Sequence, residues 1–280
     1  MPKRFLILLA VTALLALPQS QEPPAHQKLI PTLWVQSAVE WQASCRQTYL
    51  SARGALDEAL RDSRWTAEIS PSSLDPVRLA TLPPSVVLDI DETLLDNSPG
   101  QARQVKAGSG FDHKLWNQWV SESKAQPIPG ALDFCRYAAS RGVTLFYISN
   151  RDAAHESATR TNLRGLGFPL PDGLDTVLLR GERPEWTSEK STRRAHVAQT
   201  HRVLLLIGDD LGDFLHGART TAAARRQLIA PYTQFWGRKW FILPNPSYGS
   251  WEDALFTPTI PTDLNEQLRR KLTVLDTAQP

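Results

Sequence analysis

The chain has 280 residues, enough for one large domain, or a domain with an extension, and for a sizeable hydrophobic core. Its 31 Lys and Arg residues nearly balance its 29 Asp and Glu residues, which leaves a formal net charge of +2. No long basic block offers nucleic acid an electrostatic footprint, so we do not expect a nucleic-acid-binding protein.

The first residues have the pattern of an export signal. Lys3 and Arg4 precede a largely apolar run over residues 5–17, and a polar segment that contains proline follows. This pattern predicts a signal peptide over residues 1–20; the alternative is a retained amphipathic or membrane anchor, although the run is short for a bilayer span. No cysteine follows the run before Cys45, so the acceptor for an N-terminal lipid is missing. We therefore expect a periplasmic or secreted protein without a stable membrane anchor.

The next segment predicts an N-terminal helical extension over residues 27–62. Apolar side chains recur there every three or four residues, as on one face of an amphipathic helix, at Trp34, Ala38, Trp41, Cys45 and Tyr49. A Pro- and Ser-rich stretch follows, which is typical of a connecting loop. Cys45 and the later Cys135 are explained equally well as one disulfide or as two buried thiols.

The main domain is expected over residues 84–256, where apolar runs alternate with helical patterns. The expected strands are residues 86–90, 143–148, 176–179 and 203–207, and the expected helices lie near residues 131–141, 153–166 and 190–199. Continuous Val, Leu and Ile runs separated by helices predict a parallel sheet covered on both faces. We therefore expect a doubly wound α/β fold, in which ligands bind at the carboxyl ends of the strands.

Polar and charged residues stand at those strand ends and at the start of the last helix. They are Asp89, Asp91, Glu92, Ser149, Asn150, Lys190, Asp209 and Asp213. Each has an ordinary structural explanation, such as a helix cap or a solvated charge. Together they would place two carboxylate clusters, a hydroxyl and a cation on one rim of one sheet, which favours a functional site. Glu92 and Asp96 are expected to serve as turn and cap residues.

Phosphoryl transfer is the chemistry that uses this set. Carboxylates held together repel one another unless a cation lies among them, and the oxygens of Asp89 and Asp209 suit Mg²⁺. The Asp89 carboxylate can then attack phosphorus and form an aspartyl-phosphate. Ser149 and Lys190 are suited to hold the equatorial oxygens of the phosphoryl group. Asp91 is suited to protonate the leaving group and then to deprotonate the attacking water.

Four motifs resemble those of the haloacid dehalogenase superfamily: "DIDET", a strand that ends in Ser149, Lys190 and "GDDLGD". More closely, "LDIDETLLDNS", "FYISNR", "LIGDDLGDF" and "LPNPSYGSWE" resemble the class C bacterial acid phosphatases of subfamily IIIB. The resemblance covers residues 29–254, because "CRQTYLSARGALD" is also similar to the N-terminal helix of that family. Together these motifs are highly specific.

The resemblance implies a role for each matching residue. Asp89 would be the nucleophile and a metal ligand, and Asp91 the general acid and base, with its backbone carbonyl on the Mg²⁺. Asp209 would bind the metal, and Asp213, whose role rests mainly on the family, would support the water shell of the metal. The phosphoryl group would be held by Ser149, Asn150 and Lys190. The family also implies an acidic pH optimum, and many of its members are outer-membrane lipoproteins, from which this chain departs.

An insertion over residues 98–128 is long for a strand-to-helix loop and lies where a cap would cover the site. Trp116 and Trp119 in it are at helical spacing, so they belong either to the core or, for one of them, to the cleft. Tyr248 lies in a Pro- and Gly-rich loop, where an exposed ring is expected. Aromatic stacking contributes about 1–3 kcal/mol per base. Members of the family take nucleoside monophosphates, so Trp116 and Tyr248 are candidates for binding a nucleobase.

The leading prediction is therefore an exported, Mg²⁺-dependent acid phosphatase that hydrolyses small phosphomonoesters, with 5′-nucleotides among its candidate substrates. One alternative is another reaction on the same fold, such as dehalogenation or phosphonate cleavage; Asp91 argues against dehalogenation, because expelling a halide needs no general acid. The other is a non-catalytic storage or binding relative, against which the presence of Asp89 argues. Residues 257–280 predict a tail with a short helix over residues 263–275, and exposed aromatic side chains before it would suit a homodimer.

Overall fold

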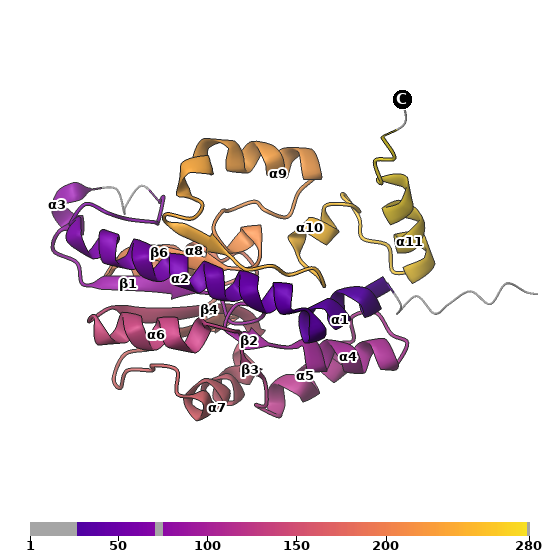
Figure 1. Ribbon diagram of the computed structural model, residues 1–280, viewed down its shortest axis with the longest axis horizontal. Coiled ribbons are helices and arrows are strands. Elements are labelled where there is room, and N and C mark those ends of the chain that lie inside the picture. The colour runs from indigo at the N-terminus through magenta and orange to yellow at the C-terminus, as the bar shows by residue number, and fades with distance from the viewer. Residues whose placement is uncertain (1–26, 71–74, 279–280) are drawn as a thin grey trace, which may run out of the picture.

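The computed structural model describes residues 27–70 and 75–278, so the expected signal peptide lies outside the described residues. A five-stranded sheet in the order β5-β4-β1-β6-β7 forms the centre of the molecule (Figure 1). Its strands are β1 (Pro84–Leu88), β4 (Thr144–Asp152), β5 (Val177–Arg180), β6 (Arg202–Gly208) and β7 (Trp240–Ile242). All neighbouring strands are parallel, and helices pack on both faces. The expected doubly wound α/β fold is confirmed.

The strands are buried on both faces because their successive side chains enter two different hydrophobic clusters. Val86 and Leu88 of β1 belong to the first cluster, whereas Val87 belongs to the second. The first cluster lies against α2 (Val39–Arg61), α6 (Ala131–Ser140) and α7 (Glu156–Leu166). The second lies against α8 (Ser191–Ala198). Continuous apolar runs are therefore the sequence pattern that this sheet requires.

The expected N-terminal helix is present but is divided into α1 (Leu29–Ser37) and α2 by the extended backbone of Ala38. One face of α2 is buried along most of its length, at Trp41, Cys45, Tyr49, Ala52, Leu56 and Ala59. Buried side chains also bond it to the core: the Tyr49 hydroxyl donates to the Thr93 carbonyl at 2.6 Å. This helix is thus part of the main hydrophobic core.

Between β1 and α6 the chain forms β2 (Leu95–Asp96), α4 (Ser98–Lys106), α5 (His113–Ser121) and β3 (Gln126–Pro127). These elements include the expected cap insertion. β2 and β3 pair in an antiparallel way at its base. α4 packs on α1 and α5, and α5 packs on α7, so the insertion rests on one side of the core (Figure 1).

The remaining helices are short and lie outside the two main layers. They are α3 (Pro76–Leu79), α9 (Ala222–Ile229), α10 (Ser250–Asp253) and α11 (Leu264–Thr273), with 3-10 turns η3 (Ala153–His155), η4 (Leu211–Asp213) and η5 (Ala230–Phe235). The expected C-terminal helix is present as α11. In the described part of the chain, no helix is both long and apolar enough to cross a membrane.

Candidate active site

The predicted site residues come together at the carboxyl ends of the strands. Asp89 directly follows β1, Ser149 lies in the last part of β4, and Asp209 directly follows β6. The chain leaves β1 toward β4 and leaves β6 toward β7, in opposite directions along the sheet. Such a reversal opens a crevice at the carboxyl ends of the strands. Lys190, directly before α8, reaches into the same place.

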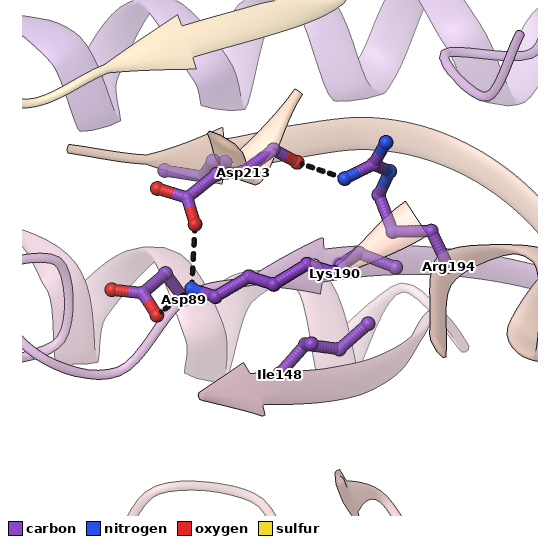
Figure 2. Close-up of a pocket in the computed structure, with 7 residues that line it drawn as sticks. Asp89, Ile148, Lys190, Arg194 and Asp213 are labelled. Carbon is purple, nitrogen blue, oxygen red and sulfur yellow. Dashed lines mark hydrogen bonds and ion pairs between the residues drawn. The ribbon is translucent and has the colours of Figure 1, made fainter. Parts of the chain in front are cut away.

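Lys190 lies between two carboxylates. Its Nζ donates hydrogen bonds to Asp89 Oδ1 and, at 2.5 Å, to Asp213 Oδ1 (Figure 2). All three side chains are buried. Burial alone would lower the pKa of Lys190, but the charges of Asp213 and Asp89 outweigh it and raise that pKa, so this side chain is a fixed cation.

Asp89, Asp209 and Asp213 form a cluster in which one oxygen of each lies within 4.8 Å of the others. Burial raises the pKa of Asp89 to about 7, although Lys190 acts in the opposite direction. Burial, followed by the charges of Asp89 and Asp213, raises the pKa of Asp209 well above its usual value. Carboxylates that repel one another in this way favour a cation among them, and their hard oxygens fit Mg²⁺. The donor set therefore fits a divalent metal ion.

Two residues that the sequence analysis did not single out orient Asp209. Its carboxylate accepts a hydrogen bond from Thr93 Oγ1 at 3.0 Å and another from Asn245 Nδ2 at 2.8 Å. The carboxylate of Asp213 has a structural role, because its Oδ2 accepts hydrogen bonds from the backbone N–H groups of Asp209 and Asp210. Asp213 thus closes the turn after β6 with one oxygen and binds Lys190 with the other.

Asp91 is held by several donors. Arg151 donates to Asp91 Oδ1 from Nη2 at 2.8 Å and from Nε at 3.0 Å, and Asn97 Nδ2 donates to the same oxygen at 2.9 Å. Ser149 Oγ donates to Asp91 Oδ2 at 3.2 Å. Two predicted site residues, Asp91 and Ser149, are therefore in direct contact. Arg151 follows the predicted pair of Ser149 and Asn150 directly, and this adjacency is the sequence signal that could have identified it.

The side chain of Asn150 does not face an open site. Its Nδ2 donates to the Ser188 carbonyl at 3.0 Å, and its Oδ1 accepts a hydrogen bond from Arg193 at 2.6 Å. Both ends of the amide are therefore used within the protein. A phosphate-binding role for Asn150 would fall to its backbone N–H.

Glu92 and Tyr248 are joined across the site. The Tyr248 hydroxyl donates to Glu92 Oε2, and Asn97 N and Gln101 Nε2 donate to Glu92 Oε1. Glu92 has a φ of 58°, so the expectation of a turn residue is confirmed, and Asp96 caps the next backbone turn by accepting Ser98 N at 2.8 Å. Burial and the Asp91 charge raise the pKa of Glu92 to about 8. Glu92 therefore also fixes the position of the Tyr248 ring, which is half-buried; the expectation of an exposed ring was wrong, because the hydroxyl turns inward to Glu92.

The two tryptophans of the insertion have different surroundings. Trp119 is 4% exposed and its Nε1 donates to Asn97 Oδ1 at 2.8 Å, so it belongs to the core. Trp116 is half-buried, and its ring centroid lies 5.9 Å from Arg151 Cζ. Trp116 is thus linked to Asp91 through Arg151, and Trp119 is linked to it through Asn97.

Known proteins match most of the chain. Residues 12–251 match the family model of the HAD superfamily, subfamily IIIB (acid phosphatase). The structure of the class C acid phosphatase from Bacillus anthracis superimposes with a TM-score of 0.79 and 34% identity, over 91% of this chain and 99% of that one. The same enzyme with tungstate bound gives a TM-score of 0.77 at 34% identity, over 90% and 98% of the two chains.

A curated relative, acid phosphatase 1 of Solanum lycopersicum, is 27% identical over 166 residues, which are 58% of this chain and 57% of that protein. The chain thus spans little more than half the length of this relative. Because the family model and the Bacillus anthracis structure each cover most of the chain, the two comparisons agree on one family. The chain belongs to the HAD superfamily, subfamily IIIB, a family of phosphomonoester hydrolases.

Proposed function

We propose that this protein is a Mg²⁺-dependent acid phosphatase that hydrolyses phosphomonoesters through an aspartyl-phosphate on Asp89. The observation that carries the proposal is the buried contact of Lys190 with Asp89 and Asp213, next to Asp209. Phosphoryl transfer needs such a combination of a carboxylate nucleophile, a fixed cation and oxygen ligands for a metal ion. The match to acid phosphatases supports the same function.

In the first step, an oxygen of Asp89 attacks phosphorus, and the bond from phosphorus to the ester oxygen breaks. Asp91 gives a proton to that oxygen, which leaves as an alcohol. Lys190 stabilises the charge of the phosphoryl oxygens, a role supported by its contact with Asp89. The Ser149 hydroxyl binds one of these oxygens, and its proximity to Asp91 supports this role.

In the second step, water attacks the phosphorus of the aspartyl-phosphate. Asp91 takes a proton from this water, the bond from phosphorus to the Asp89 oxygen breaks, and inorganic phosphate leaves. Arg151 and Asn97 keep the Asp91 carboxylate in one orientation through both steps, and their three hydrogen bonds support this role. Asp91 therefore serves as acid first and base second.

Asp89, Asp209 and the backbone carbonyl of Asp91 would hold the metal ion, with Asp213 behind them. When bound, Mg²⁺ screens the carboxylates and neutralises charge on the transferring phosphoryl group. Thr93 and Asn245 orient Asp209 for this purpose. The Bacillus anthracis relative binds tungstate, a tetrahedral oxyanion like phosphate, which supports an oxyanion site in this family.

We further propose that Trp116 and Tyr248 bind the base of a nucleoside monophosphate. The support is that Trp116 lies over Arg151, and that Glu92, which follows Asp91 directly, fixes Tyr248. Replacing both rings by Ala should lower kcat/KM for a nucleoside monophosphate more than for p-nitrophenyl phosphate. An unchanged ratio of the two values would exclude the base-binding role.

We also propose that the protein is exported, as periplasmic or secreted, on the basis of the apolar run over residues 5–17. N-terminal sequencing of the mature protein from the producing cells tests this directly. Loss of about the first 20 residues is the expected result. An intact N-terminus would contradict export through a cleaved signal peptide.

Hydrolysis of p-nitrophenyl phosphate tests the core of the proposal. Chelation should abolish the activity, and Mg²⁺ should restore it. Asp89→Asn should lower kcat by at least about a thousandfold, because no carboxylate remains to form the covalent intermediate. Asp152→Asn, which changes an exposed carboxylate paired with Arg180 at the end of β4, is the control and should retain activity. Activity that survives chelation or Asp89→Asn would contradict the mechanism.

A further inference from the structure

Helix α8 carries two neighbouring arginines that are almost completely buried. Arg193 is 0% exposed and Arg194 is 2% exposed, and both follow Lys190 within one turn of helix. A buried guanidinium is costly unless its N–H groups are hydrogen-bonded. The partners of these two side chains therefore indicate what each one is for.

The partners of Arg193 lie around the end of β4. Nη1 donates to the Ser149 carbonyl at 2.5 Å, and Nη2 donates to Asn150 Oδ1 at 2.6 Å and to the Thr187 carbonyl at 2.8 Å. Among the described residues, no carboxylate lies within ion-pair distance of Arg193. The side chain therefore acts as a multiple donor that connects Ser149 and Asn150, in the last part of β4, to the loop before Lys190.

This contact fixes the direction of one peptide group. In a trans peptide, the carbonyl of Ser149 and the N–H of Asn150 point in opposite directions. Because the Ser149 carbonyl points at Arg193, the N–H of Asn150 points away from it. Arg193 thus sets the orientation of the backbone and side chains that are proposed to bind the phosphoryl group.

The partners of Arg194 lie in the turn after β6. Nη1 donates to the Asp213 carbonyl at 2.9 Å (Figure 2). It also donates to the Gly212 carbonyl at 3.3 Å. Nε donates at 3.1 Å to Glu68, a buried carboxylate from the segment between α2 and β1. Asp213 in turn accepts the backbone N–H of Asp209. Arg194 therefore holds the turn that carries the candidate metal ligand Asp209 and the Asp213 side chain behind it.

We propose that Arg193 and Arg194 are positioning residues with separate tasks. Arg193 orients the phosphoryl-binding residues Ser149 and Asn150 in the last part of β4, and Arg194 orients the metal-binding turn after β6. The inference rests on the proposed function, because the two segments have these roles only in a metal-dependent phosphatase. α8 then aligns both segments with Lys190, which directly precedes it.

Lysine variants test the division of tasks, because a lysine keeps the charge but places all its donors on one nitrogen and cannot reproduce the spread, planar fork of the guanidinium. Calorimetry measures the binding of Mg²⁺ and, with Mg²⁺ present, of inorganic phosphate to the wild type, Arg193→Lys and Arg194→Lys. The matched control is Arg202→Lys: Arg202 is also buried, but it donates to the Asp62 carbonyl at the opposite end of β6. A wild type that binds neither ligand would contradict the proposed function itself.

Arg193→Lys should weaken phosphate binding by about tenfold and change Mg²⁺ binding by less than about twofold. Arg194→Lys should weaken Mg²⁺ binding by about tenfold, with phosphate binding at saturating Mg²⁺ nearly unchanged. Arg202→Lys should change neither constant, even if its melting temperature falls. With a wild type that binds both ligands, any other pattern in the two variants overturns the inference, including a lower melting temperature with unchanged binding.

If a lysine variant does not fold, the same contacts can be weakened by changing the residues that accept the hydrogen bonds of the two arginines. Asn150→Ala removes one acceptor of Arg193, and Glu68→Gln removes the charge that faces Arg194. The same separation is expected: Asn150→Ala weakens phosphate binding, and Glu68→Gln weakens Mg²⁺ binding. Equal effects of each variant on both ligands would overturn the inference.

Discussion

Arg151 and Asp91 form a two-point contact, with Nη2 at 2.8 Å and Nε at 3.0 Å from the same carboxylate oxygen. Arg151 is 3% exposed, and its Nη1 is fixed by Thr159 Oγ1 of α7 at 3.1 Å. The orientation of Asp91 is therefore determined by β4 and α7 as well as by its own turn. This contact makes the proposed proton transfer sensitive to Arg151.

Replacing Arg151 by Lys should have an effect that depends on the leaving group. Hydrolysis of an alkyl phosphate should fall by about 10²-fold, because the alkoxide needs a proton from a correctly held acid. Hydrolysis of p-nitrophenyl phosphate should fall much less, because its phenolate leaves without protonation. The measurement is kcat/KM for both esters, with Arg160→Gln as the control from the α7 surface. Equal losses for the two esters would contradict a role for Arg151 in positioning the acid.

Tyr49→Phe should lower the free energy of unfolding by about 1–3 kcal/mol, because the Thr93 carbonyl then lacks its buried donor. The ring of Tyr49 is 2% exposed, and Phe leaves its packing intact. Urea unfolding measures the change. Tyr137→Phe is the matched control, since its hydroxyl bonds Asp57 in a half-buried position, and a smaller loss is expected. Equal losses in the free energy of unfolding would show that the buried hydrogen bond to the Thr93 carbonyl contributes no more than the half-buried one to Asp57.

The fold could be predicted from the sequence where hydrophobic pattern alone determines the element. The runs that became β1, β4, β5 and β6 are apolar over several residues because both faces of the sheet are covered. β7 was not predicted, because three residues in an aromatic-rich segment have no distinguishing period. The break at Ala38 was missed for a related reason, since the apolar spacing continues across it.

The candidate site could be predicted only where a residue belongs to a motif next to a strand. Asp89, Asp209 and Ser149 meet because parallel strands end at one edge. Thr93 and Asn245 were missed, since their contacts with Asp209 join residues 116 and 36 positions apart. For Asn150, the motif predicts a phosphate-binding residue, but the pattern does not show that its side-chain amide bonds Arg193 and the Ser188 carbonyl. Tertiary contacts of this kind leave no local pattern in the sequence.

Two helical glycines should respond in opposite ways to Ala. A Cβ on Gly100 in α4 would lie 2.7 Å from Cγ of the buried Trp119, so Gly100→Ala should lower the free energy of unfolding by about 1–3 kcal/mol. Gly54 in α2 has open space around it, and Gly54→Ala should raise stability by about 0.5–1 kcal/mol. Chemical denaturation of both variants makes the comparison. A stabilising effect of Gly100→Ala would contradict the close packing of α4 on Trp119.

The two cysteines should behave as protected thiols. Both are buried and free, which favours the thiol alternative over a disulfide. Burial raises the pKa of Cys45 to about 12 and also raises the pKa of Cys135, so neither forms the reactive thiolate in the folded protein near pH 8. Ellman's reagent should therefore label two thiols after unfolding and none before. Rapid labelling of the native protein, or a mass that corresponds to a disulfide, would contradict this.

Mg²⁺ should stabilise the protein more at about pH 8 than at about pH 5. In the metal-free protein, the pKa of Asp89 is raised to about 7 and that of Asp209 is raised well above its usual value, in both cases first by burial. A raised folded-state pKa gives stability that is complete below the ordinary pKa of a carboxyl group and is lost as the pH rises through the folded-state value. The metal-free protein should therefore lose stability between about pH 5 and pH 8.

Mg²⁺ reverses this loss because it binds the ionised oxygens and competes with protons for them. Melting temperatures measured with chelator and with Mg²⁺ should thus diverge as the pH rises. Asp209→Asn is the control, since it removes a candidate ligand and should remove most of the Mg²⁺ effect at about pH 8 while the fold remains. If Mg²⁺ raised the melting temperature equally at both pH values, the raised carboxyl pKa values would not belong to the metal-binding groups.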